Sequence, residues 1–286
     1  MNHRDELLIH LHASLGPRNR LFQAMYDYDP SFQKMINLPP SHLEKEFSLP
    51  RGTLQHVHAP RYTPPRTVNS FPLTVLTRFS PLFPPRLQYM PDPPWVLYML
   101  GEPRITFNPA MLGVVGTRNS TVYGERVLKH FIPPLVQQGV VIASGLAAGT
   151  DSTAHRLAIQ KGKTIGILGH GFHHMYPAWN TSLRDMIAGH HLLISEYPLN
   201  TPPRKWQFPH RNRIISALSD ALFIPEAKLR SGTMTTVRAA LEQGRPVYTV
   251  PGPIFQPEAA GTNKIIQEGA GVVLGPNDLS EVLQLF

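Results

Sequence analysis

Short apolar runs alternate with amphipathic segments over the last two thirds of the chain. The runs are rich in Val, Ile and Leu and fall at residues 95–100, 111–117, 140–145, 164–169, 191–197, 221–227, 246–252 and 271–275. Helix-compatible segments separate most of them, at residues 125–139, 151–162, 181–189, 211–219, 236–244 and 278–286. Strands that alternate with helices of this length predict parallel βαβ units. Because the strands have no polar face, helices should cover both sides of the sheet. The pattern predicts an α/β fold with a doubly wound, mostly parallel sheet.

The first 50 residues follow a different pattern. Helical periodicity runs through residues 6–15 and 20–36, and residues 38–47 are also compatible with a helix. We expect a small bundle of short helices over residues 1–50. Two helices joined by a glycine-containing turn fit a nucleic-acid-binding hairpin or a simple interaction module, and the pattern leaves both open.

Proline separates these two parts of the chain. Of the 30 prolines, 17 precede residue 111. We interpret residues 51–78 as an irregular linker or covering arm, and residues 79–286 as the sheet domain.

Composition restricts the function. The formal net charge of +8 and the pI of about 9.8 favour an anionic partner, either nucleic acid or an acidic membrane surface, although a basic enzyme fits the charge as well. The absence of cysteine excludes disulfides, thiolate zinc sites and cysteine nucleophiles. The charged N-terminus has no signal-peptide core and no apolar run could span a bilayer, so we expect a cytoplasmic protein without membrane contact.

The turns that follow the predicted strands suggest a phosphate site. In doubly wound sheets the ligand lies outside the carboxyl ends of the strands. Three of these turns combine a glycine, a hydroxyl residue and a helix start, which together offer free N–H groups to phosphate: residues 116–121, 144–151 and 230–233. The dinucleotide fingerprint, the P-loop and the nucleophile elbow are all absent. A single nucleotide and a nucleic-acid backbone remain as candidates.

The loop after residues 191–197 favours nucleic acid. It interleaves cations with two aromatic rings, namely Arg204, Lys205, Arg211 and Arg213 with Trp206 and Phe208. Cations that follow phosphates beside rings that stack on bases are typical of single-strand binding. Either ring is equally compatible with an anchor in the core.

Several of these motifs resemble a known family. Phe208-Pro-His-Arg-Asn-Arg-Ile-Ile, Ser144-Gly-Leu-Ala, Ser195-Glu-Tyr-Pro, Arg230-Ser-Gly-Thr and Val250-Pro-Gly are similar to motifs of the DNA-processing protein A (Smf) family of bacterial natural transformation. The resemblance spans roughly residues 79–273. It implies an extended Rossmann-like fold, binding and protection of incoming single-stranded DNA, loading of the RecA recombinase, and a homodimer. It implies no catalytic reaction, no catalytic residues and no cofactor.

The chain departs from the family pattern in places. Ala148 stands where members often carry a basic residue, Pro225 replaces a usual valine, and Thr236 replaces a small apolar residue. We expect Pro225 to interrupt a strand. The N-terminal bundle matches the family's sterile-alpha-motif-like domain in size only, and we expect no C-terminal winged helix.

The resemblance also implies which residues contact DNA. Thr117 and Arg118 would hold one phosphate, and Ser144 and Gly145 would donate at the second turn. Phe208 would lie near a base. The remaining expected contacts are Lys205, Arg211, Asn212, Arg213, Arg230, Ser231, Gly232 and Thr233. We expect the loop that holds Arg211 and the helix start at Ser231 to share one phosphate pocket.

Each assignment has an alternative. Arg213 is also suited to a buried ion pair with Glu196 or Glu226, and Asn212 and Asp151 are typical helix caps. The cluster of His170, His173 and His174 has no carboxylates in a metal-binding pattern, so we expect no metal. Glutamates beside a phosphate turn keep a second function open, hydrolysis of a nucleoside monophosphate.

Overall fold

The sheet is the centre of the molecule and carries helices on both faces. The computed structural model describes residues 2–284, so residues 285 and 286 of the predicted sheet domain and of its last helix lie outside it. The strands are β1 (Thr67–Val68), β2 (Phe71–Thr77), β3 (Val96–Gly101), β4 (Met111–Val114), β5 (Val141–Ser144), β6 (Lys163–Leu168), β7 (Leu192–Ser195), β8 (Ala221–Ile224), β9 (Val247–Thr249) and β10 (Gly271–Val272). Their order is β1-β2-β3-β7-β6-β5-β4-β8-β9-β10. From β7 to β10 all pairs are parallel, whereas β1, β2 and β3 add an antiparallel edge. The predicted α/β, mostly parallel fold is confirmed.

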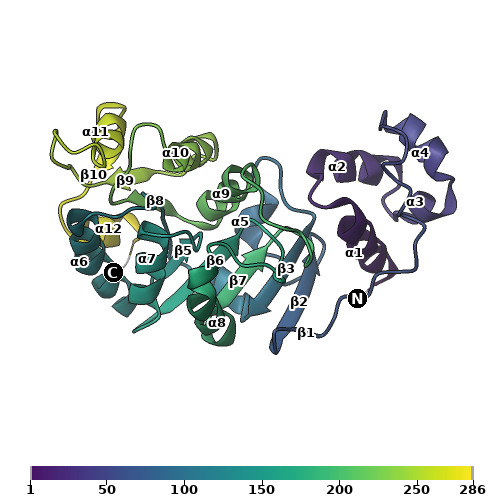
Figure 1. The fold of residues 1–286 in the computed structure, drawn as a ribbon, viewed down its shortest axis with the longest axis horizontal. Coiled ribbons are helices and arrows are strands. Elements are labelled where there is room, and N and C mark those ends of the chain that lie inside the picture. Colours follow the sequence, from purple (N-terminus) through teal and green to yellow (C-terminus); the bar gives the residue numbers. More distant parts are fainter. Residues whose placement is uncertain (1, 285–286) are drawn as a thin grey trace.

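Helices form the outer layers (Figure 1). They are α1 (His3–Leu15), α2 (Asn19–Tyr28), α3 (Gln33–Asn37), α4 (Pro40–Glu46), α5 (Pro85–Gln88), α6 (Val122–Gln137), α7 (Thr150–Ala158), α8 (Thr181–His190), α9 (Gln207–Leu218), α10 (Gly232–Glu242), α11 (Ala260–Gln267) and α12 (Pro276–Val282), with 3-10 turns at Pro103–Phe107 and Ala178–Asn180. None of the helices within residues 2–284 has the length and apolar character needed to cross a bilayer.

Side chains that point alternately to the two faces of the sheet form an apolar core on each face. In β8, Leu222 and Ile224 pack with α9 and α10, while Ala221 and Phe223 pack with α6 and α12. Successive strand side chains point to opposite faces, and here both faces are covered. Most positions of the central strands are therefore apolar, which explains the nearly continuous apolar runs in the sequence.

The arm predicted over residues 51–78 is only partly irregular, and the prediction is wrong for β2. This strand pairs along its length with β3, from Leu73 opposite Leu100 to Thr77 opposite Val96. Pro72, which lacks an N–H, is the second residue of the strand and faces the two-residue edge strand β1, where the missing donor costs little. Pro225 lies just after β8 and does not interrupt it.

The N-terminal bundle packs against the antiparallel edge through aromatic rings. Trp95 is buried directly before β3, and its ring centroid lies within 6.2 Å of those of Phe22, Tyr26 and Phe32. The bundle and the sheet share one apolar cluster, which includes Leu8 of α1 and Tyr98 of β3. The helices predicted over residues 1–50 are therefore present, and they share a core with the sheet.

Two buried histidines make stability depend on pH. The His12 ring stacks on Phe22 with centroids 5.6 Å apart and lies beside the Tyr98 hydroxyl, and His155 Nδ1 lies 2.7 Å from Thr164 Oγ1. Burial lowers the pKa of each histidine from 6.5 to about 3. Because the folded pKa lies below the unfolded one, this contribution to stability is complete above pH 6.5 and is lost as pH falls towards 3.

We expect the free energy of unfolding to fall by about 2 kcal/mol for each of these histidines between about pH 7 and about pH 5. His12→Phe keeps a ring of similar shape but cannot be protonated, so it should remove about one such contribution from the pH difference. Urea denaturation at the two pH values measures this. The same substitution at the exposed His58 is the control and should retain the parent's dependence. If His12→Phe loses as much free energy of unfolding between the two pH values as the parent does, His12 does not contribute to the pH dependence.

Candidate nucleic-acid interface

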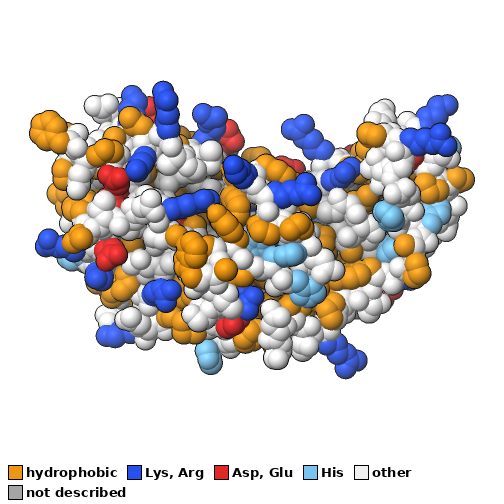
Figure 2. Space-filling model, in the orientation of Figure 1, with side chains coloured by type: hydrophobic (Ala, Val, Ile, Leu, Met, Phe, Trp, Pro, Cys, Tyr) orange, Lys and Arg blue, Asp and Glu red, His pale blue; other side chains and the backbone are white. Residues whose placement is uncertain are grey.

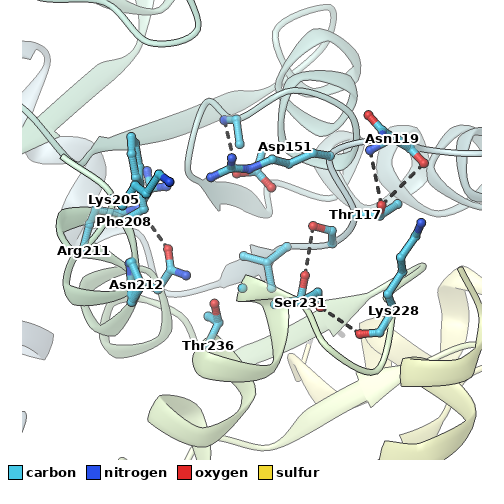
Figure 3. Close-up of a pocket in the computed structure, with 17 residues that line it drawn as sticks. Thr117, Asn119, Asp151, Lys205, Phe208, Arg211, Asn212, Lys228, Ser231 and Thr236 are labelled. Atoms are coloured by element: carbon cyan, nitrogen blue, oxygen red, sulfur yellow. Dashed lines mark hydrogen bonds between the residues drawn. The ribbon is translucent and has the colours of Figure 1, made fainter. Parts of the chain in front are cut away.

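The principal pocket lies where the winding of the sheet reverses direction. Strand β4 pairs with β5 on one side and with β8 on the other, so the helix that follows β4 and the helix that follows β8 lead away in opposite directions and leave a crevice at the carboxyl ends. A cavity of about 460 Å³ opens there (Figure 3). We call it the switch-point pocket; its lining residues are Val115, Gly116, Thr117, Arg118, Asn119, Ala147, Asp151, Lys205, Phe208, Pro209, Arg211, Asn212, Lys228, Ser231, Gly232, Thr233 and Thr236.

Arg211 and Ser231 line one pocket, as the predicted strand direction requires, whereas Arg213 and Arg230 do not line it. Arg211 and Asn212 come from the first half of α9, while Ser231, Gly232 and Thr233 come from the start of α10. In Figure 3 Arg211 and Asn212 lie on one side of the cavity and Ser231 lies across from them. The convergence arises because α9 enters and β8 leaves at the same edge of the sheet. Four cations and one carboxylate are among the residues of this lining, which gives it a positive balance.

Arg211 differs from the prediction in its environment. It lies inside α9, not in a loop, and its side chain is buried. Its Nη1 donates to the carbonyl oxygens of Gly145 (2.6 Å) and Ile167, and its Nε donates to Asn212 Oδ1 (3.0 Å). Burial lowers the pKa of Arg211 to about 10, and the negative charge of Asp151 opposes that shift. Arg211 is therefore a brace beneath the pocket that contributes charge to its floor.

Arg213 forms the buried ion pair that we considered as its alternative role. Its Nη2 donates to both oxygens of Glu196, at 2.5 and 2.6 Å. Glu196 also accepts from Asn19 of α2 at 2.9 Å, so this pair links α9, the end of β7 and the N-terminal bundle. Arg213 is absent from the lining of the pocket. The expectation that Arg213 lies near phosphates is wrong in this geometry, because its guanidinium faces away from the cavity.

The turn after β5, which holds Ser144 and Gly145, also differs from its predicted role. Ser144 is fully buried and its hydroxyl donates to the Val114 carbonyl at 2.6 Å, so the expectation of a phosphate donor there is wrong. At Gly145 a side chain would collide with the Arg211 guanidinium. The turn needs glycine for this close approach and accepts a hydrogen bond from Arg211 through its own carbonyl.

Neither predicted cap is formed. Asn212 lies in the second turn of α9, far from its N-terminus. Gly149 precedes α7, and Asp151 lies inside the first turn, where Oδ2 accepts from the Ala147 N–H at 3.3 Å. Burial raises the pKa of Asp151, and the Arg211 charge opposes that shift. Asp151 and Arg211 are thus buried opposite charges that influence each other at the base of the pocket.

The first turn presents Arg118 to the cavity. Thr117 Oγ1 accepts from the Asn119 N–H at 3.2 Å, and the Thr117 carbonyl accepts from the Thr150 N–H at 3.1 Å. These bonds hold the turn, while Arg118 is exposed and has no ion pair within residues 2–284. Thr117 and Arg118 both line the pocket, as predicted.

The start of α10 offers donors to an anion. Ser231 has the N-cap position, but its hydroxyl donates to the Lys228 carbonyl at 2.9 Å instead of capping the helix. No acidic residue lies in the first turn of α10. The N–H groups of Gly232 and Thr233 are thus available at the positive end of the helix dipole. Arg230 is exposed but is absent from the lining.

Thr236 is a pocket residue that sequence reasoning did not assign. It lines the cavity from the second turn of α10, and its buried Oγ1 has no hydrogen-bond partner among the described residues. A buried hydroxyl without a partner costs stability. The available signal in the sequence is the hydroxyl residue itself, which departs from the family pattern at this position.

A smaller aromatic compartment adjoins the pocket. It has a volume of about 180 Å³ and shares Arg118, Phe208 and Arg211 with the switch-point pocket. Its other rings are Tyr176, whose centroid lies 5.4 Å from that of Phe208, and Trp179, which is 73% exposed. Sequence reasoning missed both rings, although the stretch Met175-Tyr-Pro-Ala-Trp179 places them after β6. Ala148 also lines this compartment, so an apolar methyl replaces the usual basic residue there.

Polar groups elsewhere serve the fold. Glu226 Oε1 accepts from Thr121 Oγ1 at 2.6 Å and Oε2 from the Thr121 N–H at 2.9 Å, so its partner is a threonine and not an arginine. His173 and His174 both contact Asn200 in the loop after β7. No cluster of three metal-ligating side chains occurs in the part of the chain that the structure describes.

Comparison with known proteins agrees with this architecture. The family model described as DNA recombination-mediator protein A matches residues 74–284. DNA processing protein DprA of Bacillus subtilis is 43% identical over 217 residues, which are 76% of this chain and 71% of that protein. Protein Smf of Escherichia coli is 42% identical over 207 residues, which are 72% of this chain and 55% of that protein.

Two solved structures are similar. The X-ray structure of DNA processing protein A from Streptococcus pneumoniae superposes with a TM-score of 0.79 at 31% identity, covering 96% of each chain. DNA processing protein A from Helicobacter pylori, described for its single-stranded DNA binding mode, has a TM-score of 0.69 at 30% identity, covering 75% of this chain and 97% of that one. With the family match over most of its length, the chain belongs to the family of DNA recombination-mediator protein A, which includes DprA and Smf.

Proposed function

We propose that the switch-point pocket binds the backbone of single-stranded DNA in the cytoplasm, and that the chain protects incoming strands during transformation without catalytic turnover. The observation that supports this proposal is that two cavities of different chemical character lie next to each other. A pocket lined by exposed cations and an uncapped helix start adjoins a compartment lined by aromatic rings. Phosphates and bases are the two chemical groups that such a pair of cavities suits.

We assign one cavity to each group. A phosphate fits between Arg118, Lys205 and the N–H groups of Gly232 and Thr233. The adjacent base fits the compartment, where the Arg118 guanidinium lies 5.6 Å from the centroid of Phe208 and leaves the ring partly exposed. Bases in a duplex are paired and stacked, so they do not reach such a compartment. The description of the Helicobacter pylori relative supports this preference for single strands.

Two glutamates made hydrolysis of a nucleoside monophosphate the alternative function, and both form contacts away from the pocket. Glu196 is fully buried against Arg213, and Glu226 is buried against Thr121. Neither lines the switch-point pocket. Asp151, the carboxylate that does, is buried, accepts from the Ala147 N–H and lies in the field of the Arg211 charge. This arrangement favours binding over acid–base chemistry.

We also propose that the chain forms a homodimer and loads RecA. The description of the matching family as a recombination mediator supports the RecA contact. Ile254 and Phe255, which are 79% and 93% exposed before α11, are apolar side chains that a second protein surface would cover. Sedimentation velocity of the chain alone and mixed with RecA measures both associations.

The central test compares poly-dT with the same sequence in a duplex by fluorescence anisotropy. We expect tighter binding of the single strand and a decrease in log affinity with log salt of about 0.7 per phosphate contact. Arg118→Ala and Lys205→Ala should each reduce the slope by about that amount. Equal affinity for single strand and duplex, or hydrolysis of AMP by the same preparation, would overturn the proposal.

Arg118 and Arg211 should respond differently to truncation. Arg118→Ala removes an exposed cation and should weaken DNA binding while the thermal melt stays near the parent's. Arg211→Ala leaves Asp151 buried without its counter-charge and should cost about 3–5 kcal/mol of stability. Anisotropy and denaturation of both variants measure this. A stable Arg211→Ala variant would show that the guanidinium is not a brace.

Thr236 offers a test that separates binding from folding. Thr236→Val replaces an unpartnered buried hydroxyl by a methyl group of similar shape, so it should stabilise the fold by roughly 1 kcal/mol. If the hydroxyl donates to a bound phosphate, the same change should weaken single-strand binding by roughly 1 kcal/mol. A variant that gains stability and keeps full affinity would exclude the hydroxyl from the interface.

A further inference from the structure

A second groove lies on the other side of the segment that carries Lys205. It has a volume of about 420 Å³ and separates the N-terminal bundle from the sheet. One wall is residues 13–18, which are the last turn of α1 and the connection to α2, and the other consists of residues of the segment 197–207 that follows β7. We call this cavity the bundle groove. In Figure 2 the surface is hollowed between the bundle and the sheet, and Lys and Arg side chains gather along the hollow.

The lining of the bundle groove is positively charged. Arg18 on the bundle wall and Arg204 on the sheet wall are both exposed. Neither has an ion pair among the described residues, and no Asp or Glu is among the described side chains that line the groove. The charge that these two arginines place on facing walls is therefore available to an anion.

The bundle groove also contains an aromatic surface. Trp206 is 57% exposed, so a large part of its ring is in contact with solvent. Its ring makes tilted, edge-type contacts with Tyr197 and His210, with centroids 6.2 and 6.3 Å away. These contacts fix the orientation of the indole ring and leave surface on which a base can stack.

The two cavities are adjacent along one short segment. Lys205 lines the switch-point pocket, while its neighbours Arg204 and Trp206 line the bundle groove. Consecutive Cα atoms are about 3.8 Å apart, so this segment is a narrow ridge between the cavities. A chain of phosphates that passes Lys205 meets Arg204 and Trp206 next.

We propose that the bundle groove holds the continuation of the same DNA single strand, with a base on Trp206 and phosphates at Arg18 and Arg204. This proposal rests on the proposed function of the switch-point pocket. It gives the N-terminal bundle a direct part in binding, because one wall of the groove is the last turn of α1 and the connection to α2. The interface therefore extends over both parts of the chain. A DNA strand must be long enough to reach both cavities in order to bind with full affinity.

Strand length separates the two cavities experimentally. The full chain is titrated with labelled dT strands of about 5 and about 20 nucleotides. Trp206→Ala should weaken binding of the long strand roughly 5- to 100-fold and leave the short strand unaffected. Arg18→Ala combined with Arg204→Ala should lower the salt slope for the long strand by about 1.4, which is two contacts. Arg20→Ala removes the same charge from α2 outside the groove lining and should behave like the parent.

Tryptophan fluorescence tests directly whether a base stacks on Trp206. The long strand should quench tryptophan emission more in the parent than in Trp206→Phe, and the short strand should quench both equally. If the parent binds both lengths and the groove variants bind the long strand as tightly as the parent, the bundle groove is not part of the interface and the pocket proposal stands. If the parent binds neither length, the proposed function of the pocket is wrong as well.

Discussion

A buried guanidinium holds together the segments from which the binding pocket is built. Arg211 of α9 donates to the carbonyl of Gly145 after β5 and to that of Ile167 in β6, and it lies beside Asp151 of α7. Burying a charge in this way is costly unless hydrogen bonds and a counter-charge compensate. Here the carbonyl groups and Asp151 provide both. The floor of the pocket is therefore rigid, and cations at its rim are positioned relative to a fixed base.

The arginines of the chain divide into two groups according to their partners. Arg211, Arg213 and Arg86 are held by carbonyl or carboxylate oxygens, with Arg86 donating to both oxygens of Asp220. Arg118 and Arg204 are exposed and have no acidic partner within the described residues. The guanidinium donors of this second group are therefore available to a ligand. The cations that an anion can reach therefore depend on these partners and not on the net charge of +8.

Sequence reasoning identified the eight strands from residue 95 onwards, because parallel strands covered on both faces leave a continuous apolar signal. It also placed Ser231 and Arg211 at one pocket, since strand direction alone brings their segments to one edge. It missed β2, where Phe71-Pro-Leu-Thr-Val-Leu-Thr77 has strand composition but lies between segments dense in proline. Tyr176 and Trp179 were missed because a loop has no periodicity that would show which way its rings face.

The opposite roles of Arg211 and Arg213 follow from helix geometry. Two residues that are two positions apart on an α-helix point about 200° away from each other. Once α9 is known to begin at Gln207, only one of these arginines can face the pocket, and the other must face β7 and Glu196. The sequence pattern did not show this, because Trp206-Gln-Phe-Pro has no capping residue and Pro209 suggested a loop. Proline is tolerated in the first turn of a helix, where its missing N–H has no intrahelical acceptor. The helix therefore begins before the proline and already includes both arginines. Its helical geometry turns Arg211 towards the pocket, where it is a brace, and Arg213 towards Glu196, where it links the sheet to the N-terminal bundle.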